Sequence, residues 1–284
     1  NDLGSKPILP ELAKINAMTN YTELAKVIGQ MHRIGVGGAF RFGVGQDLKN
    51  ISSNISYIGQ GGIGLPNKDY YLKEDKQEIL EKYELHLMKL CELLKVDAQT
   101  AKKMAQSCVA IEKELAKSMM SPAELRIPEK NYNKRSKEEI EKTLEHFDFD
   151  VYLSNLGSQS FKEAIVGQPE FMKKFNKMVR ETPLEDWKAY LSLQTINHYA
   201  GHLDEKFVKA NFDFYQGVLS GKSEMKPLNE RAINEITRMS IGVALGKLFV
   251  KEHFSEEAKN RVDEMVDNLL GNSIGCQILL KKKR

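Results

Sequence analysis

Apolar side chains recur at helical spacing along most of the chain, and this pattern predicts a mainly α protein. The clearest case begins at Asn20, because Asn20 followed by Glu23 fits a helix start and Gly35 fits a helix end. The apolar positions between them are Leu24, Val27, Ile28 and Met31. Residues at this spacing share one face of a helix, so we expect a helix with one buried face.

Other helices are predicted from the same signals, because a short polar side chain before an apolar stripe can accept the unpaired N–H groups of a first turn. We expect them to begin at Asp75, Asp97, Ser136 and Thr182, the last followed by Pro183. A short break separates the stripes after Asp75 and Asp97, which predicts an antiparallel helix pair. One long helix is expected over residues 184–218, followed by helices over residues 228–254 and 255–269.

Two short segments alternate apolar and polar residues instead. Residues 39–45 place Phe40, Phe42 and Val44 on one face, and residues 54–58 repeat the alternation. This pair predicts a β-hairpin. No βαβ alternation and no internal repeat is visible, so the expected fold is a multi-helix lobe with one small β-hairpin and the glycine-rich loop that follows it.

That loop belongs to the segment G-Q-G-G-I-G-L-P-N-K-D-Y-Y-L, residues 59–72. Glycine permits a positive φ or the close approach of another chain segment, and proline fixes a turn. The residues of interest are Gly61, Gly62, Gly64, Pro66, Tyr70 and Tyr71. We expect the glycines to serve backbone geometry and the tyrosines to pack, the alternative being contact with a bound peptide.

Charge and composition exclude several classes of protein. The chain has 42 basic and 39 acidic residues, and residues 281–284, which are all basic, account for the whole of its net charge of +3. A nearly neutral body argues against nucleic-acid binding. No stretch reaches the roughly 20 apolar residues of a membrane span. Cys91, Cys108 and Cys276 lack metal spacing, and the first two fall on apolar helix faces, so we expect them to be buried thiols.

The glycine-rich segment, together with Q-D-L-K-N at residues 46–50, closely resembles a stretch of the neprilysin family of zinc metallopeptidases, which includes endothelin-converting enzymes and bacterial oligopeptidases. Three later segments resemble motifs of the same family: Y-N-K at residues 132–134, W-K-A-Y-L from Trp187, and N-F-D-F-Y, which contains Phe212 and Phe214. Ile127 interrupts the family's arginine, aspartate, proline order, and Leu228 and Asn229 stand where many members have arginine and tryptophan. The resemblance covers most of residues 5–269.

The resemblance implies that residues 1–270 form the N-terminal, non-catalytic lobe of a bacterial-type oligopeptidase, whether or not that lobe is one continuous segment of the parent enzyme. In the family this helical lobe is the lid of an internal chamber and restricts substrates to peptides. The resemblance also implies peptide substrates, zinc as the cofactor of the parent enzyme and a C-terminal catalytic lobe as partner. It further implies an extracytoplasmic location, whether periplasmic, secreted or membrane-anchored.

Zinc-dependent hydrolysis of this class needs two histidines four residues apart on a helix, a glutamate beside the first, and a third ligand further along. The sequence contains no H-E-x-x-H. His198 and His202 have the spacing, but Tyr199 replaces the glutamate, so we expect no catalytic residue and no cofactor in this chain. Surface or packed histidines are the favoured interpretation of the pair, with a metal site as the alternative. The isolated histidines, expected to be structural, are His32, His86, His146 and His253.

Residues 271–284 no longer resemble the family, which would continue into a tryptophan-methionine motif. With suitable synonymous codons, a frame shifted at Ser273 encodes D-W-M-P-D-S-T-K-K-K-A, which resembles that continuation. We therefore hypothesise a frameshift near residue 270 and expect a truncated, substrate-restricting lobe that is inactive alone. The alternative is a stand-alone helical binding or scaffold protein that exposes an apolar face.

Overall fold

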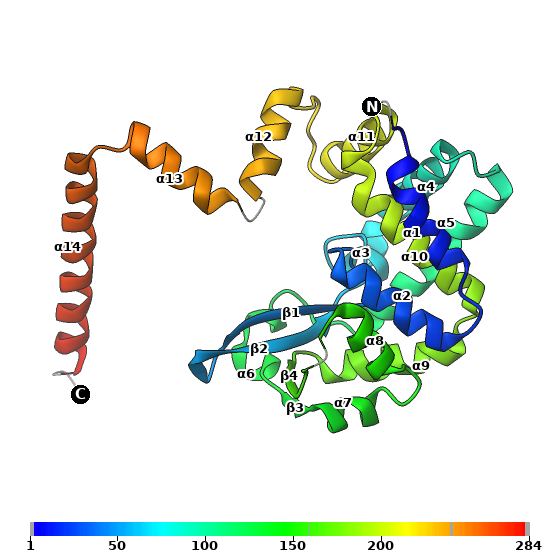
Figure 1. Cartoon of the computed structure of the whole chain (residues 1–284), viewed down its shortest axis with the longest axis horizontal. Helices are drawn as coiled ribbons and strands as arrows, with labels where there is room; N and C mark the ends of the chain where they lie inside the picture. Colours follow the sequence, from blue (N-terminus) through cyan, green and yellow to red (C-terminus); the bar gives the residue numbers. More distant parts are fainter. Residues whose placement is uncertain (1–2, 159, 239–240, 282–284) are drawn as a thin grey trace. The chain divides into compact units, whose positions relative to one another are not determined.

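The computed structural model describes residues 3–158, 160–238 and 241–281, and Figure 1 labels their elements. The chain divides into two compact units, Asn1–Ser223 and Glu224–Arg284, hereafter the first unit and the second unit. Most of the described residues are helical, which confirms the predicted mainly α fold.

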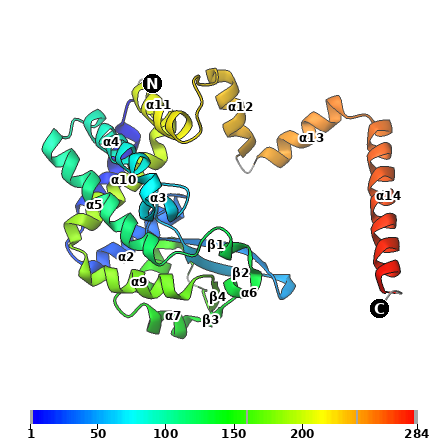
Figure 2. The same ribbon diagram turned by 180° about the vertical axis from the view of Figure 1, so that it is seen from behind.

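The first unit combines eleven α-helices in its described part with one small sheet. The α-helices are α1 (Leu9–Asn16), α2 (Tyr21–Arg33), α3 (Asp69–Leu72), α4 (Gln77–Leu93), α5 (Ala98–Lys117), α6 (Pro128–Asn131), α7 (Lys137–Thr143), α8 (Phe149–Leu156), α9 (Pro169–Glu181), α10 (Leu184–Tyr199) and α11 (Glu205–Phe212). The short elements are the 3₁₀-helices η1 (Lys6–Ile8), η2 (Glu74–Lys76), η3 (Glu124–Arg126) and η4 (Ala200–His202), and the π-helix η5 (Asp213–Val218). Helices α7 and α9 lie beside the sheet in both views (Figures 1 and 2).

The predicted starts of α2, α5 and α7 are confirmed. The side chains of Asn20 and Asp97 each accept a hydrogen bond at 3.0 Å from the backbone N–H three residues later. Ser136 forms a reciprocal capping box with Glu139. Gly35 follows α2 with a φ of +80°, a conformation that glycine adopts without strain. Helices α4 and α5 pack against each other across the short break between them.

Two predicted helix boundaries in the first unit are wrong. Helix α4 begins at Gln77 rather than at Asp75, because the 3₁₀ turn η2 occupies the position before it. In place of the single helix expected over residues 184–218, the chain forms α10 and then three shorter helical segments, η4, α11 and η5. The side chain of Asp204 accepts hydrogen bonds from two backbone N–H groups and starts α11, since a local cap competes with continuation of a helix.

The predicted β-hairpin is confirmed and is the larger part of a four-stranded sheet. β1 (Phe40–Asp47) pairs antiparallel with β2 (Asn50–Gln60). β4 (Glu163–Val166) runs parallel to β2, and β3 (Lys134–Ser136) runs antiparallel to β4, which gives the order β1-β2-β4-β3. The sequence predicted neither short strand, because three or four residues offer too few positions for a recognisable alternation.

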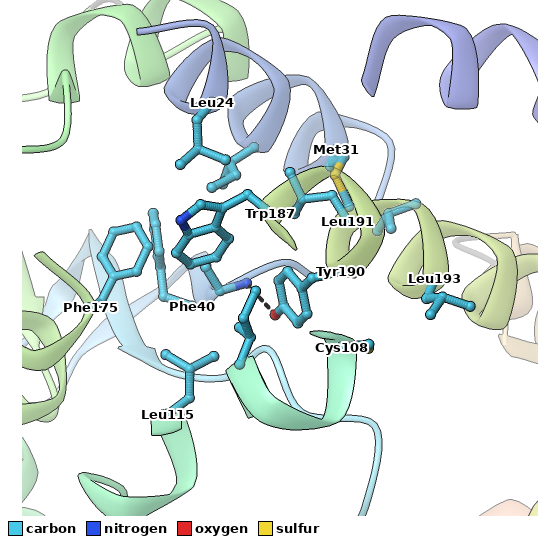
Figure 3. Packing of buried hydrophobic residues seen from close by; sticks show 14 of the residues in the cluster. Leu24, Met31, Phe40, Cys108, Leu115, Phe175, Trp187, Tyr190, Leu191 and Leu193 are labelled. Carbon is cyan, nitrogen blue, oxygen red and sulfur yellow. Dashed lines mark hydrogen bonds between the residues drawn. The ribbon is translucent and has the colours of Figure 1, made fainter. Parts of the chain in front are cut away.

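The core of the first unit gathers around Trp187 of α10, which is fully buried. Its ring meets those of Phe175 from α9 and Tyr190 edge-on, with centroids 6.2 and 5.7 Å apart. Figure 3 shows Leu24 of α2 above Trp187. It also shows Phe40, the first residue of β1, below Trp187. The W-K-A-Y-L segment therefore builds the core that joins α10 to α2, α9 and the hairpin.

The second unit consists, in its described part, of α12 (Leu228–Arg238), α13 (Gly242–His253) and α14 (Glu256–Lys281). The prediction of one helix over residues 228–254 is therefore wrong. The expected end of the last helix at Leu269 is also wrong, because α14 continues to Lys281. Gly271 weakens a helix by about 1 kcal/mol without ending it, and no proline follows Pro227.

Large apolar side chains of the second unit are exposed. Those at least 60% exposed are Leu228, Ile233, Val243, Leu248, Phe249 and Leu269. Helix α13 has no buried residue. The apolar faces of these helices are thus not covered in the described structure.

Cys91 and Cys108 are buried free thiols, as predicted. No described helix combines the length and the apolar character needed to cross a membrane.

Candidate functional site

The glycine-rich loop, residues 61–68, connects β2 to α3 and runs against the start of β1. A Cβ atom on Gly61 would lie 2.6 Å from the Cγ of Arg41. Gly62 has a φ of +73°, and a Cβ atom there would lie 2.7 Å from the Cα of Ala39. Both distances are shorter than any relaxed carbon–carbon contact, so the loop depends on glycine at both positions.

Gly64 lies equally close to α4. A Cβ atom on Gly64 would lie 1.9 Å from the hydroxyl oxygen of Tyr83, which is completely buried. The backbone N–H of Gly64 donates a hydrogen bond of 3.1 Å to Oε1 of Glu112 on α5. The absence of a side chain therefore brings the loop backbone within hydrogen-bonding distance of a buried carboxylate.

The turn and the paired aromatics after the glycines differ in exposure. Pro66 is exposed in the turn, and Tyr70 is half-buried with the ammonium of Lys76 5.6 Å from its ring centroid. Tyr71 is buried. Its hydroxyl accepts a 2.9 Å hydrogen bond from the N–H of Leu65 and so closes the turn on itself.

Glu112 is the centre of the site and is fully buried. Its Oε1 accepts hydrogen bonds from the Tyr83 hydroxyl at 3.0 Å and the Gln194 amide at 2.5 Å, besides the Gly64 N–H. Its Oε2 accepts a 2.7 Å bond from the Tyr71 hydroxyl. These five residues, the Glu112 network, join the loop to α3, α4, α5 and α10.

Burial raises the pKa of Glu112 to about 7, and hydrogen bonds from Tyr71, Tyr83 and the Gly64 N–H oppose that rise. A carboxyl group enclosed in this way cannot reach a bound substrate. What the arrangement can do chemically is to hold the loop backbone in place and to take up or release one proton.

Glu112 is a residue that was not predicted from the sequence. Its signal is positional, because it lies four residues after Cys108 and three before Leu115, on the buried stripe of α5. A charged side chain on such a stripe is rarely buried without hydrogen-bonding partners. The pattern could therefore have indicated a buried polar cluster, although not its members.

Two further tyrosines bind the carbonyl groups of the loop. The Tyr190 hydroxyl accepts a 2.8 Å hydrogen bond from the N–H of Ala39 and donates one of 2.7 Å to the carbonyl of Gly62. The Tyr215 hydroxyl donates a 3.1 Å bond to the carbonyl of Gly64. The loop backbone is thus fixed on both its N–H and its carbonyl side.

The aromatic residues of the last family motif pack beside the network. The ring of Phe214 stacks on His86 with centroids 4.9 Å apart, and Phe212 is half-buried. His86 in turn hydrogen-bonds Asn197 at 3.0 Å. Phe214 and His86 are thus both buried beside the network.

His198 and His202 lie at the end of α10 and in η4, and both side chains are exposed. Partial desolvation by the surrounding protein and the neighbouring His202 lower the pKa of His198. Across the part of the chain that the structure describes, no three side chains among histidine, cysteine, aspartate and glutamate gather as a metal site would require. His32 is packed instead, with its ring nitrogens 2.8 Å from the Tyr152 hydroxyl and 3.1 Å from the carbonyl of Gly38.

Comparison with known proteins gives consistent matches over nearly the whole chain. The N-terminal model of Peptidase family M13 matches residues 1–273. An endothelin-converting enzyme homolog from Locusta migratoria is 27% identical over 94% of this chain and 39% of its own length. A neutral endopeptidase from Lactobacillus helveticus is 24% identical over 94% of this chain and 41% of its own.

Among solved structures, the inhibitor complex of the zinc metalloprotease Zmp1 from Mycobacterium tuberculosis is similar, with a TM-score of 0.89 and 30% identity. The similarity covers 94% of this chain and 41% of Zmp1. The chain therefore spans about two fifths of the length of these relatives.

Proposed function

The chain belongs to peptidase family M13, which confirms its predicted resemblance to the neprilysin-like zinc metallopeptidases, and from that premise we propose that it is a substrate-restricting helical lobe. Peptide hydrolysis in the parent enzyme would take place at a zinc site outside residues 1–284. The lobe would cover that site and admit peptides while excluding larger substrates. Alone, the chain would have no peptidase activity.

One observation carries this proposal: the family match extends over residues 1–273 of a sequence that contains no H-E-x-x-H. Hydrolysis of this class needs zinc held by protein ligands and a general base that activates the bound water. A lobe without those groups contributes through its shape and through the surface it offers to the catalytic part.

The exposed apolar side chains of the second unit are an argument that this lobe binds a partner. Leu248 and Phe249 of α13 are 64% and 61% exposed, and other large apolar residues on α12 and α14 are exposed as well. Exposed apolar patches of this kind mark interaction surfaces. We assign them to contact with a catalytic lobe. The same side chains favour the second candidate function, a stand-alone helical binding protein that uses this surface for another partner.

A peptidase assay of the purified chain is the direct test of inactivity. We expect no cleavage of a quenched fluorescent peptide with or without added zinc. Robust cleavage that a chelator abolishes would contradict the proposal, and the variants His198→Ala and His202→Ala would then show whether that pair holds the metal.

A chimera tests the role of the lobe. Residues 1–273 would replace the matching part of M. tuberculosis Zmp1, with a chimera lacking the H-E-x-x-H glutamate as control. We expect chelator-sensitive cleavage of short peptides and no cleavage of a folded protein. Equal cleavage of both would refute size restriction, whereas a folded but inactive chimera would favour the stand-alone binding protein.

We also propose an extracytoplasmic location for the parent enzyme, on the basis of the family resemblance alone. Fractionation of cells that produce the full-length protein would test this location. Recovery with cytosolic markers would refute it.

A further inference from the structure

The hydrogen-bonding groups of the Glu112 network match an ionised carboxylate. Each of its five partners donates, the Cys108 thiol at 3.7 Å included, and neither the N–H of Gly64 nor the amide NH₂ of Gln194 can accept a bond from a protonated carboxyl. The Tyr71 hydroxyl already accepts a bond from Leu65 at 2.9 Å. The ionised form of Glu112 therefore satisfies every donor that faces it.

Protonation of Glu112 breaks this match. A proton on Oε2 would face the Tyr71 hydroxyl, which would then accept two hydrogen bonds and donate none. A proton on Oε1 would face the N–H of Gly64. The first case leaves the Tyr71 hydroxyl without its acceptor, and the second leaves either the Gly64 N–H or, if the Tyr83 hydroxyl accepts the proton, that hydroxyl without its acceptor. In both cases a neutral carboxyl accepts the bond from Gly64 more weakly than a carboxylate does.

The surroundings of Glu112 leave it as the group that changes charge near neutral pH. The titratable side chains around it are Tyr71 from α3, Tyr83 and His86 from α4, Cys108 from α5, Tyr190 from α10 and Tyr215 from η5. Burial raises the pKa of the tyrosines and the thiol and lowers the pKa of His86, so all of them are uncharged near neutral pH. None of the described side chains that hydrogen-bond Glu112 is a carboxylate or a basic group.

We propose that Glu112 makes the glycine-rich loop pH-sensitive: its carboxylate anchors Gly64 between α4 and α5 at neutral and higher pH, and its protonation in mildly acidic solution releases that anchor. Tyr71 and Tyr83 belong to the same buried cluster as Trp187, but the side chain of Trp187 makes none of the hydrogen bonds to Glu112. This inference does not depend on the proposed peptidase function. A pKa of Glu112 near 7 places the transition close to neutrality.

Amide hydrogen exchange of the full chain at pH 6 and pH 8 tests the proposal, once rates are expressed as protection relative to the intrinsic rate at each pH. With a midpoint near pH 7, the ionised fraction of Glu112 falls from about nine tenths to about one tenth, so protection of the Gly64 amide should fall about ninefold. The amide of Thr100 is the internal reference. The N–H of Thr100 donates a 3.0 Å hydrogen bond to Oδ1 of Asp97, and that bond lowers the pKa of Asp97. The Asp97 carboxylate is therefore ionised at both pH values.

The variant Glu112→Gln keeps the size of the side chain and removes its titration, so protection of Gly64 should be equal at both pH values in this variant. Equal protection in the wild-type chain, or a fall in the variant as large as in the wild type, would overturn the proposal. If the variant does not fold, carbon-13 titration of the wild-type Glu112 carboxyl decides instead. Its midpoint must coincide with the change in Gly64 protection, and a different midpoint would overturn the proposal.

Discussion

Helices α5 and α13 both carry apolar side chains at helical spacing, and the two differ completely in burial. Helix α5 buries Ala105, Cys108 and Leu115 against the rest of the first unit. Helix α13 buries nothing, and Leu248 is 64% exposed. An apolar stripe therefore predicts that a helix face will be covered, but it does not identify the surface that covers it. Four predictions test whether the two units really differ in this way.

The largest effect is expected from a core truncation. Phe175→Ala removes a fully buried ring beside Trp187 and should lower the free energy of unfolding by about 3–5 kcal/mol. The matched change in the second unit, Leu248→Ala, should cost less than about 0.5 kcal/mol. Urea unfolding followed by tryptophan fluorescence measures both, because the single tryptophan reports on the first unit. A similar cost for the two variants would mean that α13 is packed in solution.

The second effect is a change of stability with pH. We expect it in the first unit, because every described group whose pKa is clearly shifted lies there. The pKa of Glu112 is raised from its ordinary 4.5 to about 7, so the native state binds the proton more tightly than the unfolded state. Between these values the free energy of unfolding should decrease as pH rises, by at most about 1.4 kcal/mol per pH unit. Proton uptake can stabilise the fold as a whole while it weakens the bond to Gly64, because it removes a buried charge.

His32 opposes this trend and must be separated from it. Burial lowers the pKa of His32 from 6.5 to about 4, so its contribution is present above pH 6.5 and is lost as pH falls through 4. The difference between wild type and Glu112→Gln isolates Glu112, because both proteins keep His32. In urea unfolding at several pH values, the free energy of unfolding of the wild type minus that of Glu112→Gln should fall as pH rises from 4.5 to 7. A constant difference would rule out the titration of Glu112.

The third effect is the change in stability when a glycine in each unit is replaced by alanine. Gly64→Ala places a methyl group 1.9 Å from the Tyr83 hydroxyl and should cost about 1–3 kcal/mol. Gly246→Ala in α13 meets nothing within 4 Å and should increase helicity, since alanine favours a helix by about 1 kcal/mol over glycine. Tryptophan fluorescence should detect the first change and far-UV circular dichroism the second. A neutral Gly64→Ala would show that Tyr83 moves aside.

The smallest effect is expected from helix caps. Asp97→Ala removes the cap of α5 and should lower the stability of the first unit by about 1 kcal/mol. Ser255→Ala removes the corresponding cap before α14, where the Ser255 hydroxyl accepts a 3.2 Å bond from the N–H of Ala258. The Ser255 variant should leave the tryptophan unfolding curve unchanged. A shift of that curve would show that α14 unfolds together with the first unit.

Much of the fold could be predicted because it is locally encoded. The cap at Asn20, the stripe that follows it and the alternation in the hairpin are patterns within a few residues, and the structure confirms them. Strands β3 and β4 could not be found, because their existence depends on pairing with distant residues rather than on their own sequence. The break at Asp204 shows a local cap overriding a helical pattern that continues on both sides.

The candidate site was predictable only in part. The segment around Gly64 stood out because glycine has a recognisable conformational role, and the family resemblance rested on it. Glu112 lies 48 residues after Gly64, and Gln194 lies 82 residues after Glu112, so their convergence depends on how α5 and α10 pack. No local pattern carries that information.

The parallel pairing of β2 with β4 has a consequence for synthesis on the ribosome. Ser56 pairs with Ala164, so β2 is made about 100 residues before its partner, and at roughly 5–20 residues per second it waits about 5–20 seconds. During that time β1 can cover one edge of β2 while the other edge stays unpaired. A nascent chain in this state is open to pairing with foreign strands until β4 emerges.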